Sequence, residues 1–166
     1  EMNLCPFARR ELDAGRVRFF VSGAETEEQL LQDLQSELSL LNTDDSIETT
    51  LLIHPSVLQR FEDYNQFLDY AEGLLVELKL EGIYQIASFH PDYQFANTEP
   101  DDEENYTNRS PYPMLHLIRE ESLAQAVANY PDPEQIPERN IVLMKQIGRE
   151  KLQQLFRRCL SSDRGT

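Results

Sequence analysis

The sequence predicts an α+β fold, in which helices pack on a single mixed sheet. Three observations lead to this class. Strand-like and helix-like segments alternate in the first half of the chain, two strand-like segments then follow one another, and a length of 166 residues suits a single domain over 1–166. We expect the element order βαβαββαα in a two-layer, ferredoxin-like arrangement, with a doubly wound α/β fold as the alternative.

The first strand, helix and second strand are predicted from residue type and spacing. Residues 16–22 are rich in β-branched and aromatic side chains, which favour a strand. Thr26 and Gln29 then form a capping box, and leucines at helical spacing predict a helix over 26–41. Residues 47–54 predict a second strand, so the pattern of strand and helix begins to repeat.

A longer helix and a third strand are predicted next. Ser56 and Gln59 form a second capping box, and one face of the following segment stays apolar as far as Leu78. Gly82 is expected to end this helix, because glycine is the residue that most readily adopts the backbone conformation found after a helix. Residues 83–90 then predict a strand.

The last third of the chain predicts one strand and two helices. Residues 114–119 alternate in the manner of a strand. Ser122 and Gln125 form a third capping box, which opens a short helix. A long final helix is predicted from about Pro137, and residues 161–166 are expected to be a frayed tail.

The segment 91–113 has neither helical nor strand periodicity, and it is long for a connection in a compact domain. Its acidic run at 99–104 is flanked by aromatic residues that could anchor it to the body of the protein. We therefore expect a long ordered loop with an acidic, mobile tip. Long loops of this kind are often functional, although a plain surface loop is the alternative.

The chain is strongly acidic, with 15 Lys and Arg against 30 Asp and Glu and a formal net charge of −15. Such a charge repels phosphate backbones, so we expect no nucleic-acid partner and no membrane partner. Arg60 and Lys79 are the only basic residues between positions 19 and 104, whereas most of the charged residues in 139–158 are basic. The last helix could therefore dock on an acidic face, or both charged sets could be solvated helix faces.

The two cysteines, Cys5 and Cys159, lie near opposite ends of the chain and belong to no Cys-x-x-Cys motif, so a disulfide framework is not indicated. No stretch approaches the apolar length of a membrane span, and residues 1–10 lack the pattern of a signal peptide. We expect a soluble, cytoplasmic protein. No glycine-rich phosphate-binding motif follows any predicted strand, and the residues identify no cofactor.

Five motifs resemble a known family when they are taken in order. They are Leu-Cys-Pro-Phe-Ala at 4–8, His-Pro-Asp-Tyr-Gln-Phe-Ala at 90–96, Asn-Arg-Ser-Pro-Tyr-Pro at 108–113, Leu-His-Leu-Ile-Arg at 115–119 and the segment 130–140. Together they resemble the domain of unknown function 1415 family over nearly the whole chain. The resemblance implies no known activity. A helix normally precedes the Cys-Pro-Phe motif in that family, so it also implies a chain shortened at its start, without a pocket wall that this helix would build.

Cys5 is the candidate nucleophile. Arg9 and Arg10 are near it in sequence and would favour its thiolate form, while Cys159 is expected to be a core residue. A nucleophilic cysteine needs a base within hydrogen-bond reach, and His90 or His116 could supply one. The alternative is that Cys5 is only a small hydrophobic residue.

The same residues could instead hold a metal ion. Cys5, His90 and His116, with Asp92, would give nitrogen and sulfur ligands and an open position, as in catalytic zinc sites. In the thiol hypothesis Asp92 would orient a histidine. His54 is expected to be a surface residue with its hydrogen bonds satisfied.

A third hypothesis is recognition of a small anion. Arg109 and Arg119 could bind a carboxylate or phosphate beside Asn108, Ser110 and Tyr112. Alternatively, both arginines could neutralise the acidic run of the loop.

These observations predict a pocket between the Cys5 segment and residues 90–119, and a thiol- or metal-dependent enzyme acting on a small anionic ligand. The alternative is a non-enzymatic interaction or ligand-binding module, which could be a homo-oligomer. The two hypotheses differ in one geometric respect. If Cys5, His90, Arg109 and His116 line one concavity, the enzyme is favoured, and if they scatter it is not.

Overall fold

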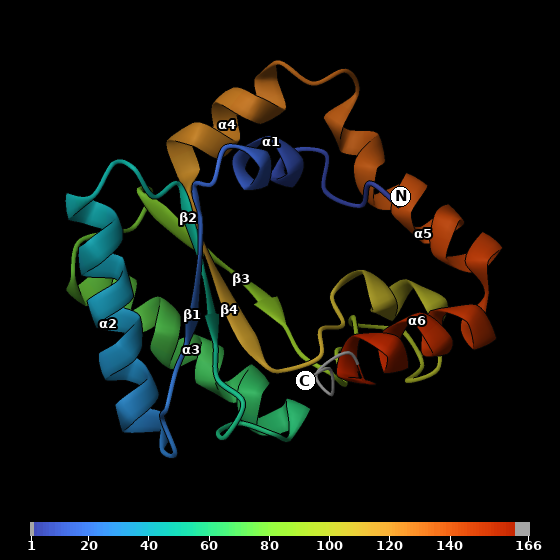
Figure 1. Ribbon diagram of the computed structural model, residues 1–166, viewed down its shortest axis with the longest axis horizontal. Coiled ribbons are helices and arrows are strands. Elements are labelled where there is room, and N and C mark those ends of the chain that lie inside the picture. The colour runs from blue at the N-terminus through green and yellow to red at the C-terminus, as the bar shows by residue number, and fades with distance from the viewer. Residues whose placement is uncertain (1, 162–166) are drawn as a thin grey trace.

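The computed structural model describes residues 2–161, which form one four-stranded mixed sheet with helices on both of its faces (Figure 1). The α+β class and the single mixed sheet predicted from the sequence are confirmed. In chain order the elements are α1 (Ala8–Asp13), β1 (Val17–Val21), α2 (Glu27–Thr43), β2 (Thr49–Ile53), α3 (Phe61–Glu77), β3 (Tyr84–Phe89), the 3-10 helix η1 (Glu103–Thr107), β4 (Met114–Arg119), α4 (Glu120–Ala128), the 3-10 helix η2 (Pro133–Gln135), α5 (Ile136–Ile147) and α6 (Arg149–Ser161).

The strands lie in the order β1-β2-β4-β3. β1 and β2 are parallel, with Val17 opposite Thr49, whereas β4 is antiparallel to both of its neighbours, β2 and β3. The first three strands therefore run in one direction, and β4 is inserted between the second and the third. The ferredoxin-like detail is not confirmed, because β1 and β2 are direct parallel neighbours.

The core lies between one face of the sheet and the helices α2 and α3. The helical spacing seen in the sequence places Leu30, Leu34 and Leu38 of α2 at 0 % exposure. The strands contribute alternate residues, so Leu115 and Leu117 of β4 are also fully buried on this side. This face of the sheet is closed by well-packed apolar side chains.

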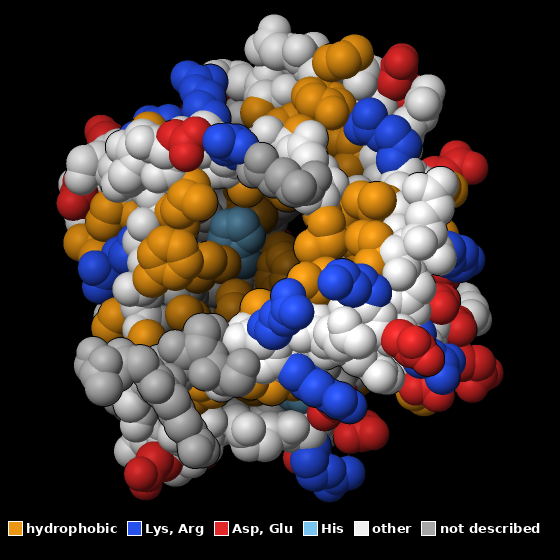
Figure 2. Space-filling view, turned by 45° about the vertical axis from the view of Figure 1, so that its right-hand side comes forward, with side chains coloured by type: hydrophobic (Ala, Val, Ile, Leu, Met, Phe, Trp, Pro, Cys, Tyr) orange, Lys and Arg blue, Asp and Glu red, His pale blue; other side chains and the backbone are white. Residues whose placement is uncertain are grey.

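The opposite face of the sheet is covered only in part. Phe19 and Val21 of β1 are 58 % and 63 % exposed. The segments that lie over this face are α1 and a C-terminal arm made of α4, α5 and α6 (Figure 1). Figure 2 shows a hollow bordered by hydrophobic side chains, with a histidine side chain inside it.

Two of the predicted capping boxes are wrong. Leu58 has a positive φ of 59°, so the chain turns there and α3 begins only at Phe61, without a side-chain cap. The Gln59 amide instead donates to Pro55 O at 2.9 Å. In the same way α4 begins at Glu120, which leaves Ser122 inside the helix rather than at its cap. By contrast, the Thr26 hydroxyl of α2 accepts a hydrogen bond from the Gln29 N–H, as predicted.

The ends and number of the helices also differ from the sequence prediction. The positive φ that follows α3 is at Lys79, so the helix ends before Gly82 is reached. The long final helix is broken at Gly148, whose φ of 77° separates α5 from α6. The sequence does not predict helix α1, because this helix has no apolar stripe. In agreement, none of its residues is buried.

The long loop 91–113 is ordered around Asn105, which is fully buried. The Asn105 Oδ1 accepts hydrogen bonds from Phe95 N at 3.0 Å and Thr98 Oγ1 at 2.9 Å, and Nδ2 donates to Glu99 O at 2.8 Å. One amide thus joins the incoming part of the loop to η1. Of the predicted C-terminal tail, residues 162–166 lie outside the described residues.

The acidic part of the loop contacts the C-terminal arm. Lys145 lies 2.9 Å from the Glu104 carboxylate, and Arg149 lies 3.2 Å from that of Asp101. The predicted docking of the basic C-terminal segment on an acidic face is therefore present, although the segment is two helices rather than one. Across residues 2–161, no helix is long and apolar enough to cross a membrane.

His54 is buried at the end of β2, so its prediction as a surface residue is wrong. Its Nδ1 donates to Val57 O at 3.1 Å, and its ring stacks on Tyr64 at 5.8 Å between centroids. Its Nε2 is buried and has no hydrogen-bond partner among the described residues. Burial, which disfavours the charged form, is the main cause that lowers the pKa of His54 to about 4, and the nearby His90 adds a smaller effect in the same direction.

We expect His54 to make the protein less stable in acid. The unfolded chain takes up a proton near the ordinary pKa of 6.5, whereas folded His54 does so only at about 4. As pH falls between these values the unfolded state binds more protons, so the free energy of unfolding drops by about 3 kcal/mol. Urea unfolding at pH 7 and near pH 4.5 measures this loss. His54→Asn, which keeps a donor for Val57 O but does not titrate, should show a smaller loss, and an equal loss in both proteins would contradict the assignment.

Candidate functional site

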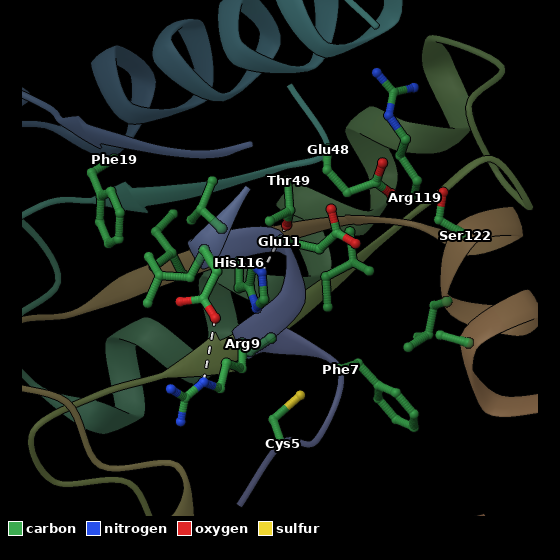
Figure 3. Close-up of a pocket in the computed structure, with 18 of the residues that line it drawn as sticks. Cys5, Phe7, Arg9, Glu11, Phe19, Glu48, Thr49, His116, Arg119 and Ser122 are labelled. Carbon is green, nitrogen blue, oxygen red and sulfur yellow. Dashed lines mark hydrogen bonds and ion pairs between the residues drawn. The ribbon is translucent and has the colours of Figure 1, made fainter. Parts of the chain in front are cut away.

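The partly covered face of the sheet holds a pocket of about 520 Å³ (Figure 3). Its floor is the sheet, where side chains of three strands point the same way because strand residues alternate between faces: Val17, Phe19, Leu51, His116 and Ile118. The segment 3–13 lies over this floor, and Leu123 and Ala126 of α4 add a side wall. Most of the lining is therefore apolar.

Segment 3–13, which forms the roof of the pocket, is held mainly at its ends. The Asn140 Nδ2 donates to Leu4 O at 2.9 Å, and the Phe7 ring meets Tyr130 edge-on at 5.4 Å. At the other end, Glu11 pairs with Arg16 just before β1. No α1 residue is buried, so this helix covers the pocket without filling it.

His116 is the histidine that lines the pocket, and its tautomer follows from its hydrogen bonds. The Thr49 hydroxyl donates its proton to Leu117 O at 2.5 Å. The same hydroxyl lies 2.8 Å from His116 Nε2, so it must accept from an Nε2–H group (Figure 3). His116 Nδ1 is then unprotonated. It makes no hydrogen bond with other described residues and is a free acceptor within the pocket.

Burial also keeps His116 uncharged. Its pKa is lowered to about 4, because the apolar surroundings disfavour the imidazolium form. At neutral pH the pocket therefore contains a neutral ring with a lone pair on Nδ1. Such a group suits a hydrogen bond with an N–H or O–H donor of a ligand.

Cys5 lies at the edge of the same pocket, near Phe7 (Figure 3). It is exposed to solvent. Within the described part of the chain, no hydrogen bond joins its sulfur to His116 or to another base. The structure thus brings Cys5 and His116 to one pocket without pairing them. Cys159, which was expected in the core, is exposed on α6.

Two carboxylates face one end of the pocket. Glu11 and Glu48 are 18 % and 15 % exposed. Both pair with Arg16, which lies 3.6 Å from Glu48 and closer to Glu11, while the largely exposed Arg10 is 3.8 Å from Glu11. Arg16 is therefore paired more closely with Glu11 than with Glu48.

Arg119, predicted to bind an anion, has its guanidinium engaged elsewhere. It donates to Leu41 O and Ile47 O, and to the Tyr84 hydroxyl at 2.9 Å. These carbonyls belong to the end of α2 and the connection that follows, where a cation is favoured by the helix dipole. The stem of Arg119 borders the pocket, but Figure 3 shows its guanidinium pointing away from His116.

His90 lies at the end of β3 and outside this pocket. Its Nε2 donates to Leu58 O at 3.1 Å, and its Nδ1 accepts from the Asp92 backbone N–H at 3.0 Å. The ring is fully buried and packs between Phe61 and Tyr64. Burial lowers its pKa. With both nitrogens occupied, His90 fixes the start of the long loop, and Asp92 contributes a backbone group rather than its carboxylate.

The remaining predicted ligand-binding residues organise the loop 91–113. The Arg109 guanidinium donates to Tyr93 O at 3.3 Å and Pro100 O at 2.6 Å, and it stacks on the Tyr106 ring. Asn108 donates to Ser88 O at 3.1 Å. Tyr112 is 41 % exposed on the surface. None of the three lines the pocket.

The hypothesised metal ligands do not form a cluster. Among residues 2–161, no three side chains of His, Cys, Asp or Glu lie close enough to hold a metal ion together. Cys5 and His116 line the pocket, whereas His90 and Asp92 lie outside it, where β3 ends and the loop 91–113 begins. The four residues proposed from the sequence as metal ligands therefore do not come together in one site.

Sequence reasoning missed Thr49, Glu48 and Glu11, which define the polar part of the pocket. The alternation of β2 and β4 carried part of the signal, because it places Thr49 and His116 on the same face as diagonal neighbours in the strand pair. Glu11 had no such signal, since α1 was not predicted.

We expect Thr49→Val to remove the preference of His116 for a single tautomer. The substitution removes the hydroxyl that accepts from Nε2–H, so ¹⁵N NMR should show a mixture of tautomers in place of one, and stability should fall by about 1–2 kcal/mol. The matched control is Thr50→Val, because the buried Thr50 hydroxyl has no hydrogen-bond partner among the described residues. Identical imidazole spectra for both variants would contradict the assigned hydrogen bonds.

Comparison with known proteins gives a family but no function. A family model described as "Protein of unknown function (DUF1415)" matches residues 1–154. A search of curated proteins and a search of solved structures each found no match.

Proposed function

The chain belongs to the family described as protein of unknown function (DUF1415), and from its pocket we propose that it binds a small molecule with an apolar body. The observation that carries this proposal is the combination of an open, mainly apolar cavity with a free acceptor on its floor, His116 Nδ1. Ligand sites are commonly cavities of roughly 300–1,000 Å³ with a few polar groups that orient the ligand. The pocket here, at about 520 Å³, falls in that range.

The exposed apolar side chains support the same proposal. Phe19 is 58 % exposed and Leu12, on the roof, is 55 % exposed, and both line the pocket. A ligand in contact with them would remove apolar surface from water, which contributes roughly 25 cal/mol per Å². His116 would then receive a hydrogen bond from the ligand and fix its orientation.

A thiol-dependent enzyme is the second candidate, because Cys5 lines the same pocket as His116. Of the four residues whose convergence would favour an enzyme, only these two meet there. A binding module is therefore the better supported function. In the enzyme hypothesis, Cys5→Ser would abolish turnover and leave binding intact.

The sequence supports proposals for the partners and the location. A net charge of −15 supports partners other than nucleic acid or anionic membranes, and we propose a cytoplasmic protein. A homo-oligomer is compatible with the exposed side chains of β1, but a ligand also accounts for the exposure of Phe19.

Filling the pocket should weaken binding. Ala126 lines the pocket from α4, so Ala126→Phe places a ring where the ligand body would lie. Binding of the neutral probe N-phenyl-1-naphthylamine, followed by its fluorescence, should weaken by at least about tenfold, which is the order expected when roughly 1.4 kcal/mol of contact is lost.

The matched control is Ala124→Phe on the same helix. Ala124 is exposed and lies outside the pocket, so this variant should bind the probe as the parent protein does. If the parent protein does not bind the probe, or if both variants bind it equally well, the pocket is not the binding site.

A further inference from the structure

The polar groups that the pocket offers to a ligand are mostly acceptors. His116 Nδ1 accepts, because its other nitrogen already donates to Thr49. Glu11 and Glu48 add carboxylate oxygens at one end. The uncharged Ser122 and Asn3 also border the pocket, and each has a donor as well as an acceptor. A ligand that fits this set must bring donors of its own.

The guanidinium groups near the pocket do not offset this excess of hydrogen-bond acceptors. Arg119 is held by backbone carbonyls and points away. Arg9 pairs with Asp13 at 3.3 Å, and both side chains are more than 60 % exposed to water. Arg16 does not line the pocket, and its guanidinium pairs with Glu11 and Glu48, which do. Glu11 and Glu48 therefore offer carboxylate oxygens at this end of the pocket, while the guanidinium groups near it are engaged with other groups.

Glu48 is the carboxylate best placed to meet a ligand. Its only ion pair among the described residues is with Arg16, at the long distance of 3.6 Å, and its side chain is 15 % exposed. Glu11 has the closer pair with Arg16 and a second contact with Arg10. In Figure 3 the two carboxylates lie between His116 and Ser122, at the same end of the pocket. One guanidinium therefore serves two carboxylates that border an apolar cavity.

We propose that this pocket selects an amphipathic organic cation: a molecule with an apolar body and an amino group that pairs with Glu48 and donates hydrogen bonds to the acceptors of the pocket. This inference rests on the proposed binding function and names its ligand class. It departs from the small anion expected from the sequence, because Arg109 and Arg119 are both engaged with carbonyl groups. The neutral state of His116 at pH 7 is compatible with it, since no charge on the floor repels the amine.

The charge of the ligand can be tested with three probes that share one apolar body. They are 2-(1-naphthyl)ethylamine, 2-(1-naphthyl)ethanol and 1-naphthaleneacetate, which are cationic, neutral and anionic at pH 7. Calorimetric titration of the whole chain should give the tightest binding for the amine, about tenfold tighter than the alcohol, and the weakest for the carboxylate. The advantage of the amine should shrink at 1 M NaCl, where salt screens the charges.

A matched pair of variants tests the role of Glu48. Glu48→Gln keeps the shape of the side chain and removes its charge, so binding of the amine should weaken about tenfold while binding of the alcohol stays unchanged. The unchanged alcohol also shows that the variant is folded. Glu77→Gln, on α3 and outside the pocket, removes the same charge from the chain and should leave all three affinities as they are.

The outcomes separate this inference from the function on which it rests. Equal affinities for the three probes, or tightest binding of the carboxylate, would overturn the cation and leave a binding pocket. An amine preference that survives in Glu48→Gln would also overturn it. If no probe binds to the parent protein, both the ligand class and the proposed function are wrong.

Discussion

The packing of α2 and α3 on the same face of the sheet determines how the rest of the molecule is built. Each of these helices connects two parallel strands, and such connections are right-handed. The path from β1 to β2 to β3 moves across the sheet in one direction, so both right-handed connections must pass over the same face. The second face receives no crossover helix. Its cover has to come from segments outside the crossovers, which are α1 and the C-terminal arm.

The pocket is a consequence of this one-sided packing. The alternating strands send Leu115 and Leu117 into the helical core and His116 and Ile118 to the other side, where the cover is incomplete. On the core side the polar ring of His54 is buried and stacks on Tyr64. On the pocket side His116 has a fixed tautomer and a free nitrogen. The same residue type therefore has a structural role on one face and, in the proposed function, would orient a ligand on the other.

The periodic elements could be predicted from the sequence because they bury one face, as the leucines of α2 do. Helix starts were less predictable. Ser56 and Ser122 have the spacing of capping boxes, but in each case the backbone begins the helix elsewhere, at Phe61 and at Glu120. A capping pattern needs a suitable backbone at the cap, and the turn at Leu58 removes it for α3.

The site could be predicted only in part. The residue types of Cys5 and His116 mark them as candidates, and both line one pocket. His90 and Arg109 are candidates on the same grounds, but they hold the loop 91–113 instead. Which role a residue takes depends on its hydrogen-bond partners, and most of these are backbone carbonyls of distant segments. Sequence spacing does not reveal such partners. The acceptor-rich character of the pocket likewise depends on where each guanidinium points.

The proposed function places a ligand in the cavity beneath segment 3–13, and the two thiols of the chain allow a direct test. Cys5 lines the cavity, whereas Cys159 is exposed on α6, outside it, and serves as an internal control. The measurement is the rate of maleimide labelling at each cysteine, resolved by mass spectrometry, with and without saturating N-phenyl-1-naphthylamine. A ligand in the cavity should slow labelling of Cys5 severalfold and leave Cys159 unchanged. Equal rates at Cys5 with and without bound probe would contradict the account.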